Sequence, residues 1–140
     1  MTQKHHHKYE YRIHKVQDYI CSHLDQDLNL ETLASMSALS PFHFHRVFKS
    51  VAGETLHAFV LRMRLVKSCT LLLANPNTKI IEIAMTCGFS TPSSFAKTFK
   101  KHFYMSPSEY RGSHLPKKSK IGKSLSKTRT ATSKTGQATN

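Results

Sequence analysis

The stretch that decides the fold is residues 33–40, which read Leu-Ala-Ser-Met-Ser-Ala-Leu-Ser and run into Phe, Arg, Phe and Lys at positions 44, 46, 48 and 49. A degenerate copy, residues 83–90, reads Ile-Ala-Met-Thr-Cys-Gly-Phe-Ser and runs into Phe, Lys, Phe and Lys at positions 95, 97, 99 and 100. Each copy has the pattern of a short helix, a tight turn and a second helix with a basic outer face. The repeat therefore predicts two helix-turn-helix units in one chain.

Helical patterns continue on both sides of the two copies. Apolar residues at positions 9, 13, 16, 20 and 24 recur at helical spacing and predict an amphipathic first helix after a tail of residues 1–8. Asn29 and the pair Ser40-Pro41 are typical residues for the start of a helix. We therefore expect an all-α domain over residues 9–112. It would contain a first helix-turn-helix at 30–53, a long linker helix at 55–74 and a second helix-turn-helix at 79–103.

The charge of the chain limits its partners. There are 21 Lys and Arg residues against 8 Asp and Glu residues, a net charge of +13, which favours a polyanion, with a membrane surface as the other candidate. The longest apolar runs are far too short to span a bilayer, and the N-terminus lacks the apolar stretch of a signal peptide. We therefore expect a cytoplasmic protein with no membrane partner.

Residues 113–140 differ in composition from the rest of the chain. They hold seven basic residues, no acidic residue and almost nothing apolar. Such a segment cannot bury enough surface to offset the entropy of ordering it. We predict a disordered basic tail that adds non-specific attraction to phosphates.

Neither a cofactor nor a metal is expected. The three cysteines, at positions 21, 69 and 87, are far apart and lack the CxxC spacing of a zinc site, so we expect them to be reduced and buried. His43 and His45 are two residues apart and point in different directions on a helix, which rules out a two-histidine site on one face. No nucleophile, base and orienting group can be assembled from the motifs, which argues against an enzyme.

The second helix of the first copy, Pro41 to Ala52, carries the candidate base-reading residues. Positions 44, 47, 48 and 51 have the spacing of a buried face, which leaves Phe42, His45, Arg46 and Lys49 facing outward. An arginine can donate two hydrogen bonds to guanine, a histidine can donate to a base, and an aromatic ring can cover a thymine methyl group. Lys49 is better placed for a phosphate. An ordinary solvated face is the alternative interpretation, but an exposed phenylalanine beside an arginine argues against it.

The corresponding helix of the second copy is simpler in chemistry. Phe95, Phe99 and Phe103 would face inward, while Ser93, Lys97 and Lys100 would face outward. Serine and lysine discriminate bases less well than histidine and arginine. The second helix is therefore expected to contribute more to affinity than to the choice of sequence.

The segment from Ile13 to Arg111 resembles the DNA-binding domain of the AraC/XylS-type transcriptional regulators. The resemblance rests on these residues: Leu33-Ala34, Ser40 through Lys49, Gly53-Glu54, Phe59-Val60, Arg64-Leu65, Ile80, Ile83-Ala84, Gly88-Phe89, Phe95, Phe99-Lys100, Ser106-Pro107 and Tyr110-Arg111. It implies about seven helices in two homeodomain-like helix-turn-helix subdomains, which bind successive major-groove segments on one face of double-stranded DNA. It also implies that bases are read by Phe42, His45 and Arg46 in the first unit and by Pro92, Ser93 and Lys97 in the second.

Three residues depart from the pattern of this family. Leu56 stands where many members have proline, and Tyr104 where many have glycine. The turns before the linker helix and before the last helix are therefore expected to differ in shape. Pro92 occupies a position that is often polar in the family.

These observations predict a sequence-specific transcriptional regulator of double-stranded DNA. The expected mode is an activator that contacts RNA polymerase and binds DNA as a monomer. The alternative is a non-specific architectural DNA-binding protein, which the basic tail alone would support. The chemical variety of Phe42, His45 and Arg46 favours the regulator. The sequence is compatible both with a free-standing regulator and with part of a longer protein.

Overall fold

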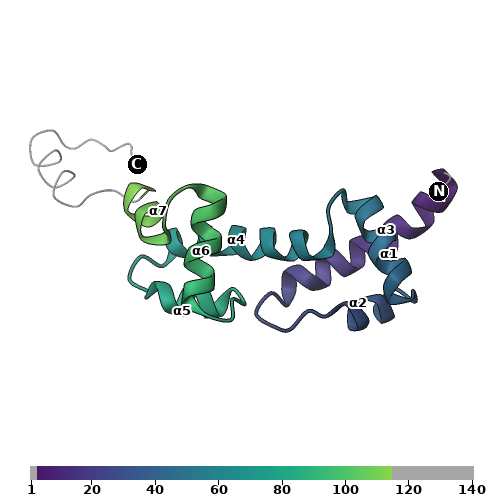
Figure 1. Cartoon of the computed structure of the whole chain (residues 1–140), viewed down its shortest axis with the longest axis horizontal. Coiled ribbons are helices and arrows are strands. Elements are labelled where there is room, and N and C mark those ends of the chain that lie inside the picture. Colours follow the sequence, from purple (N-terminus) through teal and green to yellow (C-terminus); the bar gives the residue numbers. More distant parts are fainter. Residues whose placement is uncertain (1–2, 115–140) are drawn as a thin grey trace, which may run out of the picture.

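The computed structural model describes residues 3–114, with side chains from residue 8 onward, and this part of the chain consists of seven helices and contains no strand (Figure 1). The helices are α1 (Gln3–Ser22), α2 (Leu30–Met36), α3 (Pro41–Ala52), α4 (Leu56–Ala74), α5 (Ile80–Thr86), α6 (Pro92–Phe103) and α7 (Pro107–His114). The expected all-α class is confirmed.

The first unit has its own hydrophobic core. Helices α1, α2 and α3 enclose it together with the N-terminal half of α4. The buried residues are Ile13, Val16, Ile20, Leu24, Leu33, Ala34, Phe44, Val47, Phe48, Leu56, Phe59 and Val60. Phe48 of α3 meets Phe59 of α4 edge to face at 5.6 Å, which docks the second helix of the helix-turn-helix onto the linker helix.

The second unit repeats this arrangement around a separate core. The C-terminal half of α4, with α5, α6 and α7, encloses Leu65, Leu72, Ile83, Ala84, Cys87, Phe89, Phe95 and Phe99. Phe99 meets Tyr110 of α7 edge to face at 5.5 Å, the counterpart of the pair in the first unit. Helix α4 therefore serves two roles, because it closes the first unit and opens the second.

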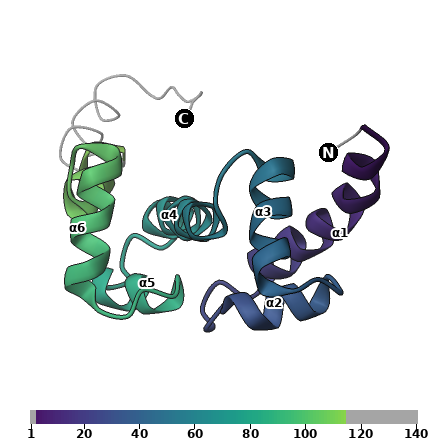
Figure 2. The same cartoon turned by 45° about the vertical axis from the view of Figure 1, so that its right-hand side comes forward.

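Helix α4 places the two units side by side. It runs between them along the long axis of the molecule (Figure 1). When α4 is seen nearly end-on, α3 and α6 lie to its right and left, and α2 and α5 both lie below it (Figure 2). The two helix-turn-helix units therefore face the same way.

Two expected boundaries and one burial prediction are wrong. Helix α1 begins at Gln3, so residues 3–8 belong to it and not to a tail; they contain neither glycine nor proline, and each added residue extends the hydrogen-bonded ladder. Helix α7 continues to His114, and the rest of the predicted basic tail lies outside the described residues. Cys21 is exposed, because it lies beside the buried stripe of α1, whereas Cys69 is half-buried and Cys87 is buried.

The turns that depart from the family pattern keep ordinary helix boundaries. Thr55 caps α4 by accepting a hydrogen bond from the Ala58 amide at 3.1 Å, and Leu56 takes the first helical position. Tyr104 ends α6 with φ of 61°, the left-handed conformation that Gly53 adopts with φ of 80° at the end of α3. The expected difference in shape is therefore not seen at Tyr104, which adopts the backbone conformation of a glycine.

Candidate nucleic-acid interface

The ends of α3 are set by residues that suit them chemically. The Ser40 hydroxyl accepts a hydrogen bond from the His43 amide at 3.2 Å, and Pro41 occupies the first turn, where its missing N–H costs nothing. Gly53 closes the helix in the left-handed conformation. With Phe44, Val47 and Phe48 buried, the direction and rotation of α3 on its unit are determined.

The structure places all four predicted residues of α3 on the surface. Phe42, His45, Arg46 and Lys49 are all exposed, and the Phe42 side chain retains 71% of its accessible surface. The Arg46 guanidinium carbon lies 5.7 Å from the centre of the Phe42 ring, within range of a cation–π contact. The ring therefore lies beside the guanidinium on the outer face of the helix.

Helix α6 is built in the same way but presents a different surface. The Thr91 hydroxyl accepts a hydrogen bond from the Ser94 amide at 3.0 Å, and Pro92 occupies the first turn. All four predicted residues, Pro92, Ser93, Lys97 and Lys100, are exposed. The last turn carries Lys100, Lys101 and His102. The four predicted residues offer two ammonium groups, one hydroxyl and a proline ring, and no arginine fork.

Pro92 has a structural role that the sequence pattern also indicates. It is the first residue of α6, directly after the capping threonine, where proline is favoured. Its ring carries no hydrogen-bonding group. Any contribution that it makes to a bound partner is therefore through shape and apolar contact.

Helix α1 supports the first unit through contacts that the sequence did not reveal. The Tyr9 ring meets the His43 ring edge to face at 5.4 Å, and the Arg12 guanidinium lies 5.7 Å from the Tyr9 ring. Arg12 also donates a hydrogen bond to the Ser37 carbonyl in the turn before α3, at 3.4 Å. No local pattern signals the Tyr9–His43 and Arg12–Ser37 pairs, because their partners are 34 and 25 residues apart in the chain.

The described surface thus combines two exposed strips, each on the second helix of a helix-turn-helix: one on α3 with Phe42, His45, Arg46 and Lys49, and one on α6 with Pro92, Ser93, Lys97 and Lys100. The model of a helix-turn-helix family, described as "Helix-turn-helix domain", matches residues 33–113, more than half of the chain. The chain belongs to the AraC/XylS-type family. This confirms the resemblance on which the expected architecture was based.

Individual members of the family show how far the likeness extends. The regulatory protein PocR of Salmonella typhimurium is 39% identical over 100 residues, which cover 71% of this chain and 33% of PocR. The C-terminal domain of AraT, a response regulator from Geobacillus stearothermophilus, superposes with a TM-score of 0.71 at 31% identity, covering 76% of this chain and 88% of that structure. The chain spans about a third of the length of PocR and of other long curated relatives.

One neighbour was solved with nucleic acid. The DNA-binding domain of AdpA, described as a global transcriptional factor in complex with a target DNA, superposes with a TM-score of 0.69 at 26% identity. The alignment covers 73% of this chain and 91% of that structure.

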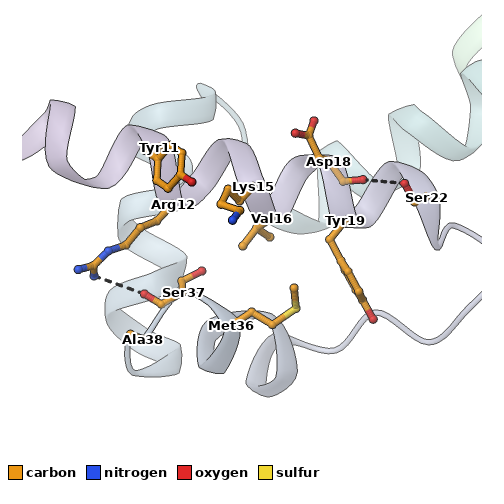
Figure 3. Close-up of a pocket in the computed structure, with 10 residues that line it drawn as sticks. All are labelled: Tyr11, Arg12, Lys15, Val16, Asp18, Tyr19, Ser22, Met36, Ser37 and Ala38. Carbon is orange, nitrogen blue, oxygen red and sulfur yellow. Dashed lines mark hydrogen bonds between the residues drawn. The ribbon is translucent and has the colours of Figure 1, made fainter.

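A groove on the AraC-type domain lies apart from both strips. It has a volume of about 720 Å³ and runs between α1 and α2 (Figure 3). Its lining residues are Tyr11, Arg12, Lys15, Val16, Asp18, Tyr19, Ser22, Met36, Ser37 and Ala38, which include none of the eight predicted contact residues. Figure 3 shows Lys15 and Val16 of α1 on one side of the groove and Met36 of α2 on the other.

Two further features are absent from the described residues. Among residues 8–114, no three His, Cys, Asp or Glu side chains come together in a way that could hold a metal ion. Within the same range, no helix has the length and apolar character needed to cross a membrane.

Proposed function

We propose that this chain binds double-stranded DNA sequence-specifically and regulates transcription, with α3 and α6 entering successive major-groove segments. The observation that carries the proposal is the exposed strip of Phe42, His45 and Arg46 on a helix whose other face is buried. A major groove admits an α-helix, and these three side chains differ in what they can recognise at a base edge. The likeness to a domain solved with its target DNA supports the same conclusion.

The two helices are proposed to have unequal roles. Arg46 can donate two parallel hydrogen bonds to guanine O6 and N7, and the contact with Phe42 limits its freedom before binding. On α6, Lys97 and Lys100 present ammonium groups, which act as point charges toward phosphates. We therefore assign most of the base discrimination to α3, and to α6 mainly affinity and register. Lys49 is assigned to a phosphate.

The binding unit is proposed to be a monomer. Both reading helices belong to one chain, and α2 and α5 lie on the same side of α4 (Figure 2). Successive major-groove segments on one face of DNA are about 34 Å apart, so one chain would cover roughly 20 base pairs. A site read by two different helices need not be palindromic. We further propose that the bound protein activates transcription through contact with RNA polymerase.

Selection of bound sequences from a random DNA pool tests this proposal directly. We expect enrichment of one asymmetric sequence of roughly 20 base pairs, bound by one protein molecule in analytical ultracentrifugation. No enrichment over the starting pool, together with retained binding, would instead indicate a non-specific architectural protein. A reporter gene placed behind the selected sequence then separates activation from repression.

A further inference from the structure

The two units touch each other at a point away from α3 and α6. Gly88, in the turn between α5 and α6, has φ of 94° and approaches the loop that follows α1. A Cβ atom at this position would lie 1.9 Å from the Leu24 carbonyl oxygen and 2.7 Å from Arg64 Nε. A side chain of any size is therefore excluded while the units keep their present separation.

Arg64 of α4 occupies the same point. Its Nε donates a hydrogen bond to the Leu24 carbonyl at 3.0 Å, and its Nη2 donates to the Gln26 carbonyl at 3.0 Å. Partial burial lowers the pKa of the guanidinium, while the nearby Asp27 acts in the opposite direction. One arginine thus joins the linker helix to the α1–α2 loop within the first unit, and its guanidinium lies against Gly88 of the second unit.

The first unit shows that this turn does not itself require glycine. Ala38, the residue equivalent to Gly88, adopts φ of 58° and is exposed. A methyl group is thus compatible with the left-handed turn when nothing lies opposite. What excludes it at residue 88 is the carbonyl of Leu24 and the guanidinium of Arg64.

We infer that Gly88, Arg64 and the Leu24 carbonyl form an inter-unit latch that sets the relative orientation of α3 and α6, and thereby the spacing of the two DNA segments that the chain reads. The part concerning DNA rests on the proposed function. Helix α4 defines the axis between the units, because each of its halves is built into a different core. The latch limits how far the units rotate about that axis and how far apart they move. Arg64 and Gly88 act as positioning residues, since they belong to neither strip.

Residual dipolar couplings of backbone amides test the latch in the free protein. In the wild type, one alignment tensor should fit the couplings of both units. Arg64→Met, which removes both hydrogen bonds, and Gly88→Ala, which forces the units apart, should each require two tensors, while the couplings within each unit still fit its own structure. An unchanged single tensor in Arg64→Met would overturn the latch, even if Gly88→Ala failed to fold.

Matched controls separate the latch from local effects. Arg62→Met removes an arginine of the same helix that bonds Glu54 within the first unit, and it should leave a single tensor. Gly53→Ala places alanine at φ of 80° with nothing within 4 Å, so it carries the backbone strain of Gly88→Ala without the collision. If either control also required two alignment tensors, the change in the two test variants could not be assigned to the latch, and the inference would fail.

A spacing assay then tests the consequence for DNA. One base pair inserted between the two segments of the selected sequence should weaken wild-type binding about tenfold, comparable to a mismatch. For Arg64→Met the same insertion should cost less than about threefold, because the units can readjust. An equal penalty in both proteins would overturn the spacing role. If the wild type selected no sequence, the proposed function would fail. The residual dipolar couplings of the free protein would still show whether the latch exists.

Discussion

The two helix-turn-helix units adopt the left-handed backbone conformation at the same two places but use glycine at opposite ones. In the turn before the second helix, the first unit has Ala38 with φ of 58° and the second has Gly88 with φ of 94°. At the end of that helix, the first unit has Gly53 with φ of 80° and the second has Tyr104 with φ of 61°. The backbone pattern is shared, whereas the residues that satisfy it are exchanged.

The surroundings explain part of this exchange. Gly88 faces the Leu24 carbonyl of the other unit, so it has no room for a Cβ atom, whereas Ala38 is exposed. At the other position, a Cβ atom added to Gly53 would meet nothing within 4 Å, and the Tyr104 side chain keeps 89% of its accessible surface. Glycine is therefore required at residue 88 by packing, and favoured at residue 53 only by its backbone freedom. Nothing in the structure explains why residue 104 is tyrosine.

The largest expected effect is on the free energy of unfolding, and it tests whether the two cores unfold independently. Phe48→Ala and Phe99→Ala remove equivalent rings that are fully buried in different cores. Each should destabilise its own unit by about 3–5 kcal/mol, because a cavity is left where the ring was. Native-state hydrogen exchange should show the larger loss of protection in the mutated unit. Equal losses in both units would show that the two units unfold as one, and the comparison between them would lose its thermodynamic meaning.

The next largest effect is on DNA affinity, and it distinguishes the role of the strip on α3 from that of the strip on α6. Arg46→Ala should weaken binding to the selected DNA by about 1–3 kcal/mol and relax the preference at one base pair. Lys97→Ala should weaken binding less and more evenly over sequences, because an ammonium group on a phosphate carries no sequence information. Binding isotherms on the selected sequence and its single-base variants would measure both. The opposite ranking of the two variants would reject our assignment of unequal roles to α3 and α6.

A smaller effect tests the exchange at the helix ends. Tyr104→Gly should raise the free energy of unfolding by about 1 kcal/mol, because the left-handed conformation disfavours a residue with a Cβ atom. Gly53→Ala should lower it by a similar amount, since only the backbone conformation is affected. Urea denaturation of both variants provides the comparison. A loss of stability in Tyr104→Gly would mean that the tyrosine side chain contributes a contact that outweighs the strain of its backbone.

The smallest effect concerns the basic segment beyond both units. Removing residues 115–140 deletes seven Lys and Arg residues. Thermal melting of the remainder should change little, and DNA binding should weaken at low salt. The slope of log K against log salt should flatten by about 0.9 for each lost phosphate contact. Preference for the selected DNA over random DNA should persist, and its loss would show that this segment reads sequence or supports the fold.

Much of the candidate site was predictable because it depends on local chemistry. Ser40 and Pro41 start α3 where the pattern indicated, and the spacing of Phe44, Val47 and Phe48 turns the opposite face outward. The start of α1 was not predictable from apolar periodicity, because residues 3–8 contain no apolar residue and polar residues can continue a helix that is already nucleated. Exposure of Cys21, in contrast, follows from its angle on α1 beside the apolar stripe that the spacing had already indicated.

The sequence by itself determined the all-α class, the two helix-turn-helix units and the exposed faces of α3 and α6, because helical periodicity and capping residues act over a few positions of the chain. Only the tertiary structure decided what holds these elements in place. The contacts of Tyr9 with His43, of Arg12 with Ser37 and of Arg64 with Leu24 join residues 25 to 40 positions apart. Such contacts leave no periodic trace, because their partners meet only after both cores have formed.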